Sequence, residues 1–222
     1  NEGEYDNTYG TNHEEKVGRT EFRSINTNLA YNEDNLTSTL DLTYAEQDNY
    51  DYIVGKSKKS GGITSINQIN AAWLNSYRVN EQLALGGGLD YRREELDEGY
   101  TGSSYYKPEE NPRENYGVSV ISQYTIDSWT LEASARNDEN SQYGNNTTWQ
   151  AAAGWTFLDN YEIKASHGTA FRAPTFLDLY YPGYEAPNLK AEDSQNTELT
   201  LEGSHSYFCL LYTSPSPRDT PI

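Results

Sequence analysis

The sequence predicts an all-β fold, an antiparallel up-and-down meander of about nine strands that forms part of an incomplete transmembrane β-barrel. Apolar and polar residues alternate with a period of two along stretches of ten or more residues, as in strands with one apolar face. These stretches are joined alternately by short polar turns and by long acidic segments rich in Tyr. Short turns on one side and long loops on the other are typical of a barrel that crosses a membrane.

The strands are predicted from the parity of their apolar residues. In the second stretch, for example, Leu40, Leu42 and Tyr44 share one face, and the residues between them are polar. Most stretches are longer than the mean of about 5 to 6 residues for strands of soluble proteins, and tilted membrane strands need about 9 to 11. The nine predicted strands lie near residues 17–31, 36–47, 64–77, 82–96, 113–125, 129–138, 147–157, 161–170 and 193–203.

The connections alternate in length. Tight turns are predicted from Asn32 to Asn35, Arg78 to Glu81, Ile126 to Ser128 and Leu158 to Asn160. Long loops are predicted from Gln47 to Ile63, Asp97 to Arg113, Asp138 to Asn146 and Ala170 to Glu192. Within the last loop, the run from Thr175 to Tyr181 is expected to form a turn or a small helix before Pro182 and Gly183.

Aromatic residues gather at the strand ends on the apolar parity, where two girdles at the headgroup levels are expected. The group beside the short turns is Tyr31, Tyr77, Tyr124, Trp129, Trp155, Phe157 and Tyr161, and the group toward the long loops is Tyr44, Tyr91, Tyr116 and Trp149. The same aromatics would also suit the core of a soluble β-sandwich, which is the alternative fold.

Composition excludes several classes of protein. The net charge of −18 argues against a nucleic-acid surface, which needs clustered Lys and Arg. An aromatic content of 13% with regular alternation disfavours disorder. No nucleophile elbow, P-loop or dinucleotide fingerprint is present, so we expect no enzyme. His13, His167 and His205 lack metal-ligand spacing and are expected to be surface or wall residues.

The chain is expected to be a piece of a longer protein. Barrels made of one bacterial chain have an even number of strands, and residue 1 begins without the basic start and apolar core of a signal peptide. The stretch CLLYTSPSPRD, from Cys209 to Asp219, resembles a translated sequencing adapter. We therefore expect residues 1–208 to be partial barrel and residues 209–222 to be a non-native tail.

Three ordered motifs between Ala135 and Gly203 carry a family resemblance: WQAAAGW, ASHGTAFRAPTFLDLY and NLKAEDSQNTELTLEG. They resemble the TonB-dependent outer-membrane receptors, and among these most the cobalamin-transporting members. His167 departs from the aromatic residue that such receptors often carry there. The resemblance implies a bacterial outer-membrane barrel of about 22 strands, a ligand that is cobalamin or a related corrinoid, and an internal plug domain, outside this chain, that TonB drives. Outer-membrane lipid and lipopolysaccharide would surround it.

Candidate binding residues lie in acidic, Tyr-rich segments expected to be extracellular loops, where Tyr gives contact area at low rotamer cost. They are Tyr5, Tyr50, Tyr52, Tyr105 and Tyr106. The resemblance further implies that Asp6, beside Tyr5, contributes to a calcium site, since hard oxygen ligands suit calcium; a solvated acidic loop is the alternative. No other cofactor is required.

Two further expectations concern the lumen. Glu198 and Glu202 share a parity opposite Leu199 and should face inward, and Arg172 is either a partner for such carboxylates or a solvated charge at the rim. The functional alternatives are a receptor for a ferric siderophore, a passive porin-like channel, and a soluble adhesive β protein.

Overall fold

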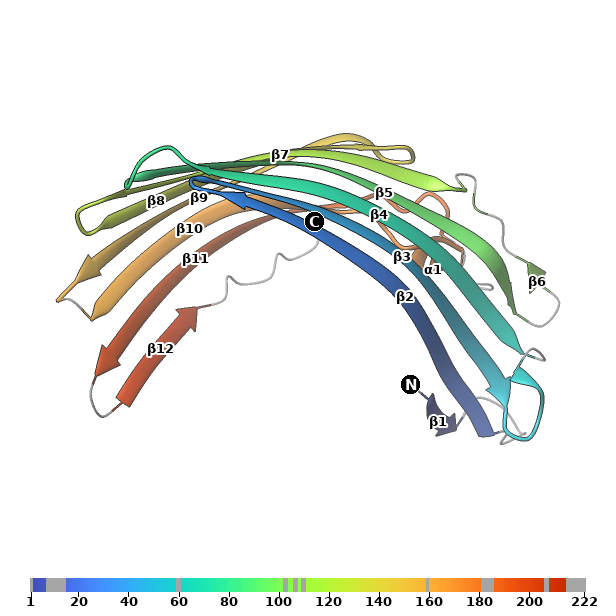
Figure 1. Cartoon of the computed structure of the whole chain (residues 1–222). Coiled ribbons are helices and arrows are strands. Elements are labelled where there is room, and N and C mark those ends of the chain that lie inside the picture. The colour runs from blue at the N-terminus through green and yellow to red at the C-terminus, as the bar shows by residue number, and fades with distance from the viewer. Residues whose placement is uncertain are drawn as a thin grey trace.

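The computed structural model describes residues 2–6, 15–58, 61–101, 104–105, 108, 111–158, 160–180, 186–205 and 208–214. They form one sheet that bends into an open arch (Figure 1). Strands that follow one another in the chain are antiparallel neighbours in the sheet, except that β7 pairs with β5 and the short β6 pairs only with β5. The long strands are β2 (Glu15–Glu33), β3 (Leu36–Ile53), β4 (Gly62–Arg78), β5 (Leu83–Thr101), β7 (Arg113–Ile126), β8 (Trp129–Asn140), β9 (Gly144–Phe157), β10 (Tyr161–Arg172) and β11 (Glu192–His205).

These nine long strands confirm the nine predicted ones and the meander. Three short strands are additional: β1 (Glu2–Asp6), β6 (Ser104–Tyr105) and β12 (Phe208–Ser214). The sequence does not predict β1 or β6, because such short acidic or polar runs show too little alternation. Most of β12 lies in the expected non-native tail, where it pairs with β11. Strands pair through the backbone whatever their side chains, and the non-native origin of residues 209–222 stays a prediction.

The long loops are shorter than predicted. β3 continues to Ile53 and β5 to Thr101, so the bounds predicted at Gln47 and Asp97 are wrong. The loop predicted from Asp138 to Asn146 is a turn of residues 141–143. In these extensions of the strands the backbone pairing continues, but polar residues occur on both faces of the sheet. The apolar period of two, which is the basis for placing the strand ends, is absent from them. The predicted short turns are confirmed, and Asp34, Asp127 and Leu158 within them take positive φ angles of 40°, 50° and 50°.

The convex face of the sheet carries an apolar band. Its side chains are exposed on an isolated chain: Ile25 is 71% exposed and Val120 is 58% exposed. On β9 the band runs from Trp149 to Phe157, which is eight residue steps of ~3.3 Å each. For a strand tilted by ~40° this length corresponds to about 20 Å along the membrane normal. The rings at both ends bring it close to the ~25 Å expected for a membrane barrel.

Four residues of the predicted girdle beside the short turns form a continuous aromatic row on the convex face. Trp129 stacks on Trp155 with ring centroids 5.9 Å apart, and Phe157 contacts Trp155 at 5.1 Å and Tyr161 at 5.8 Å. Toward the other end of the strands, Tyr91 and Tyr116 contact each other at 5.0 Å. The outward aromatics therefore gather at two levels, as predicted.

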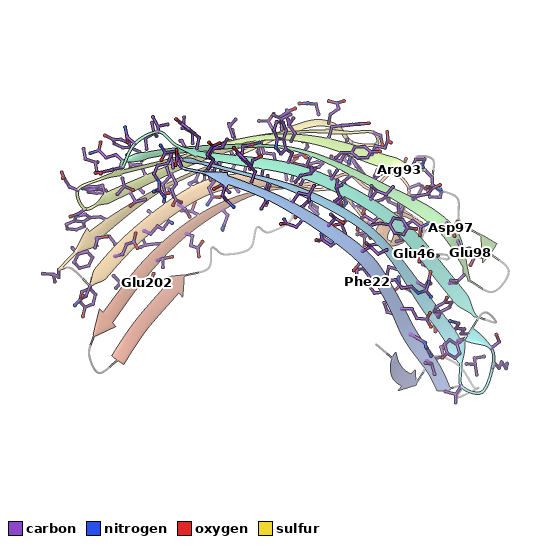
Figure 2. All side chains as sticks on the ribbon, viewed as in Figure 1. Phe22, Glu46, Arg93, Asp97, Glu98 and Glu202 are labelled. Carbon is purple, nitrogen blue, oxygen red and sulfur yellow. The ribbon has the colours of Figure 1, made fainter. Side chains whose placement is uncertain are left out.

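The concave face is mainly polar, and the apolar side chains of Phe22, Leu74 and Ile121 are also exposed on it. Asn28 donates to Asp41 on β3, Asn115 donates to Asp138 on β8, and Gln123 donates to Glu132. Glu198 and Glu202 lie on this face as predicted, opposite Ser166 and Glu162 in the register. Figure 2 labels Glu202 on β11. A wall with an apolar convex face and a polar concave face encloses a watery lumen.

The helix α1 (Phe176–Tyr180) lies under the arch, between β10 and β11 in the chain (Figure 1). It confirms the small helix predicted within Thr175 to Tyr181. Phe176 and Leu179 are almost completely buried against Leu96 of β5 and Ile66 of β4. In the described part of the chain, no helix has the length and apolar character that a membrane-crossing helix needs.

Candidate functional site

The concave face is hollowed beside α1, toward the end of the sheet opposite the short turns. This hollow, the lumenal groove, has a volume of about 620 Å³. Strands β4, β5, β7 and β8 supply its floor, and the segment that leads from β10 into α1 forms one side. Its charged and amide lining is Asn70, Asp90, Arg92, Glu94, Arg113, Asn115, Arg136, Asp138 and Asn140, with Arg172 at the rim.

The floor of the groove holds a bidentate ion pair between strands that are not neighbours. Arg136 of β8 donates from Nη1 and Nη2 to the two carboxylate oxygens of Asp90 on β5, at 2.6 and 2.8 Å. Its Nε and Nη2 also donate to Asp138, at 2.7 and 2.6 Å. The guanidinium crosses β7 at Gly117, where an added Cβ would lie 2.2 Å from Nη2. Only glycine leaves room for this crossing.

The side of the groove is fixed by a second arginine. Arg113 of β7 is 7% exposed, and its Nε and Nη2 donate to Oε2 of Glu94 on β5 at 3.2 and 2.7 Å. Its Nη1 donates to the carbonyl oxygen of Pro174 at 2.6 Å, and its guanidinium lies 4.8 Å from the ring centroid of Phe176. Arg92 also donates to Glu94. One guanidinium thus joins the wall to the segment before α1.

The first turn of α1 is closed by its own residues. The backbone N–H and the hydroxyl of Thr175 donate to Oδ2 of Asp178, at 2.9 and 2.8 Å. The N–H of Asp178 donates back to the Thr175 hydroxyl at 3.2 Å, which is the reciprocal arrangement of a capping box. The backbone and hydroxyl hydrogen bonds from Thr175 lower the pKa of the Asp178 carboxyl below its ordinary value.

The groove is chemically a hydrogen-bonding surface of balanced charge. Three arginines, Arg92, Arg113 and Arg136, are paired with the three carboxylates of Asp90, Glu94 and Asp138. Amides of Asn70, Asn115 and Asn140 also line the groove. Such a surface can hold an uncharged polar ligand that both donates and accepts. Within the described residues, no group of three or more His, Cys, Asp and Glu side chains gathers as a metal ion would require.

Two of the predicted binding residues lie on a strand and not in a loop. Tyr50 and Tyr52 are in β3, paired with Arg19 and Val17 of β2, so the loop assignment of this segment is wrong. Tyr50 is 7% exposed, and the Lys58 ammonium lies 4.5 Å from its ring centroid. Both tyrosines share the strand parity of Tyr44, which belongs to the convex face. Their role in binding stays a prediction.

The other predicted positions lie at the edge of the described chain. Tyr5 and Asp6 belong to β1, opposite Lys16 and Glu15 of β2, and not to a loop. Tyr105 pairs with Tyr100 through β6. Tyr106 and His13 lie outside the described residues. Calcium binding at Asp6 stays a prediction.

The residues that line the groove are missed by sequence reasoning. The sequence assigns no partner to Glu94 or Asp138, and the structure pairs them with Arg113 and Arg136. The available signal is that Asp90, Arg92 and Glu94 alternate on the polar parity of β5. Arg172 is a charge at the rim: its Nη1 lies 3.9 Å from Oε2 of Glu192, and both side chains are at least 70% exposed.

A meander with an apolar convex band, two aromatic levels and a polar lumen is the wall of a membrane β-barrel. The chain belongs to the TonB-dependent receptor-like β-barrel family, whose family model matches residues 1–209. It is therefore part of a receptor barrel of the outer membrane.

Curated relatives agree with this family. The chain is 35% identical over 204 residues to the vitamin B12 transporter BtuB of Photobacterium profundum, covering 92% of this chain and 32% of that protein. It is 34% identical over 203 residues to the vitamin B12 transporter BtuB of Vibrio cholerae serotype O1, covering 91% and 32%. The chain thus spans about a third of the length of these relatives.

Solved structures share the fold. The siderophore receptor PirA from Acinetobacter baumannii superimposes with a TM-score of 0.68 at 12% identity, over 87% of this chain and 33% of that chain. The copper transporter OprC superimposes with a TM-score of 0.67 at 14% identity, over 92% and 39%. At these identities the likeness concerns the fold alone.

Proposed function

We propose that the complete protein is a TonB-dependent transporter that takes up cobalamin or a related corrinoid across the outer membrane. The observation that carries this proposal is the identity of 35% to a vitamin B12 transporter over nearly the whole chain. Relatives of this similarity are far nearer than the siderophore and copper proteins that share the fold at 12–14%. In this proposal the chain supplies one sector of the wall and its share of the ligand chamber.

The lumenal groove supports a corrinoid over a ferric siderophore. Cyanocobalamin is uncharged overall, and its rim of amide groups both donates and accepts hydrogen bonds. Three arginines balanced by three carboxylates, with amides beside them, are matched to such a rim. An anionic ferric chelate would favour an excess of arginine, which this groove does not have.

The remaining partners follow from the family. The plug and the segment that contacts TonB would lie in the rest of the protein, so the energy for uptake would reach this wall only through them. An isolated sector should therefore neither transport nor conduct. Lipid and lipopolysaccharide would contact the apolar band, from Ile25 on β2 to Leu199 on β11.

Binding by the complete receptor in outer-membrane vesicles tests the ligand. We expect saturable binding of radiolabelled cyanocobalamin at nanomolar concentrations and none of ferric enterobactin. Uptake by cells should disappear when TonB is deleted. Binding of the ferric chelate without cobalamin would reverse the assignment in favour of a siderophore, and steady conductance of the receptor in planar bilayers would indicate a passive channel.

A further inference from the structure

The segment from Ala173 to Tyr180, which follows the last paired residue of β10, has little reason to hold its place by itself. A helix of five residues is far below the ~12 to 15 residues at which helices become marginally stable in water. The capping box of Thr175 and Asp178 closes only the first turn. The position of α1 therefore depends on what it contacts on the wall.

Those contacts are few. Among the described residues, Phe176 and Leu179 pack on Leu96 and Ile66, and Arg113 is the wall residue that donates a side-chain hydrogen bond to the segment. The backbone N–H of Ala186 also donates to the Leu179 carbonyl, but Ala186 lies outside the wall strands. Since Arg113 is 7% exposed, its bond to the Pro174 carbonyl is shielded from competing water. Glu94 holds the other side of the guanidinium in a fixed orientation.

The same segment forms one side of the lumenal groove. Ala173 and Thr175 of the segment line it, next to Phe171 and Arg172 at the end of β10. Without the segment, this side of the hollow would be open to the lumen. The groove therefore has its present shape only while the segment is attached.

We propose that Arg113 is the positioning residue of the ligand chamber: it fastens the segment from Ala173 to Tyr180 to the wall and so determines how long a bound ligand stays in the groove. This inference rests on the proposed function only for the identity of the ligand. The attachment of the segment is a property of the protein without ligand. An arginine is suited to this task because one planar group satisfies a carboxylate, a carbonyl and an aromatic ring together.

Hydrogen exchange on the complete receptor tests the attachment without any ligand. In Arg113→Ala, we expect the amides of residues 173–180, including Leu179, to exchange at least tenfold faster, while peptides within β9 stay unchanged. Arg113→Lys should fall between, since an ammonium lacks the planar fork. The matched control is Arg93→Gln, which removes the neighbouring arginine of β5 that pairs with Glu95 (Figure 2). Unchanged exchange in Arg113→Ala would overturn the proposal.

The dissociation rate of cyanocobalamin gives the second readout. We expect it to rise about tenfold in Arg113→Ala and to stay as in the wild type in Arg93→Gln, with an unchanged melting temperature of the barrel. A variant whose whole barrel melts earlier with the segment still protected would reduce Arg113 to a structural residue. If Arg113→Ala does not fold, Glu94→Gln decides, since it should raise exchange of residues 173–180 several-fold. A receptor that binds no corrinoid would end the proposed function and leave the exchange result intact.

Discussion

Arg136 on β8 and Asp90 on β5 form a bidentate ion pair across an intervening strand, with both contacts at or below 2.8 Å. The pair exists because Gly117 of β7 has no side chain to block it. The sheet thereby gains a polar connection between strands that share no backbone hydrogen bonds. This connection forms the floor of the lumenal groove.

Gly117→Val should separate this pair. The added Cβ would lie 2.2 Å from Nη2 of Arg136 and 2.6 Å from Oδ1 of Asp90, so the guanidinium must leave. We expect at least a tenfold loss of cyanocobalamin affinity in the complete receptor, measured by equilibrium binding. Gly87→Ala on β5 is the control, because its Cβ would meet its nearest neighbour, the Ser119 carbonyl oxygen, at an ordinary 3.4 Å. Equal losses in both variants would contradict the prediction.

A double-mutant cycle of Asp90→Asn and Arg136→Gln should show coupling. Residues in one ion-pair network interact by about 0.5–3 kcal/mol, and the bidentate geometry favours the upper half of that range. The free energy of ligand binding is measured for the wild type, both single variants and the double variant. Additive losses would mean that the two side chains act on the ligand independently.

Val120→Arg should destabilise the barrel in lipid. Val120 lies on the convex face within the apolar band of β7, and an arginine near the midplane of a membrane barrel costs about 2–4 kcal/mol. The free energy of unfolding into urea from lipid vesicles measures this cost. Gln123→Arg, on the same strand with the opposite parity, faces Glu132 in the lumen and should change stability little. Similar costs for both would mean that lipid does not contact this face.

The order of α1 should depend on acid pH. Because hydrogen bonds from Thr175 lower the pKa of Asp178 below 3.8, the carboxylate stabilises the folded turn fully above that pH. This contribution is lost as the pH falls through the lowered pKa. The protection factor of the Leu179 amide, followed from about pH 6 to about pH 2.5, should decrease at the acid end in the wild type. In Asp178→Asn it should show no such step.

The wall of the barrel could be predicted from the sequence because one physical rule covers it. Residues such as Leu40 and Val118 must face lipid, and the intervening residues must face water, so parity fixes both faces. Beyond the apolar band, toward the long loops, this rule does not apply because water contacts both faces of the sheet. For that reason the sequence predicts a loop at Tyr50, although this residue lies on a paired strand.

The groove could not be predicted for a different reason. Arg113 bonds to Pro174 across 61 residues, and Arg136 bonds to Asp90 across 46. These partners depend on the stagger of the strands and on the direction in which the β10–β11 segment turns, and neither leaves a local pattern. The polar parity of Asp90 and Glu94 predicts that both side chains face the lumen. The parity does not identify the arginines with which they pair.

The upper parts of β2 and β3 have one more consequence. Their register runs without a shift from Glu33 and Leu36 at the turn to Lys16 and Ile53, far beyond the apolar band. Chain that is already hydrogen-bonded in a sheet has given up its conformational entropy during folding. A ligand that contacts this sector should therefore bind without having to order it. The temperature dependence of the binding affinity should then reflect only the enthalpy of the contacts between ligand and sector.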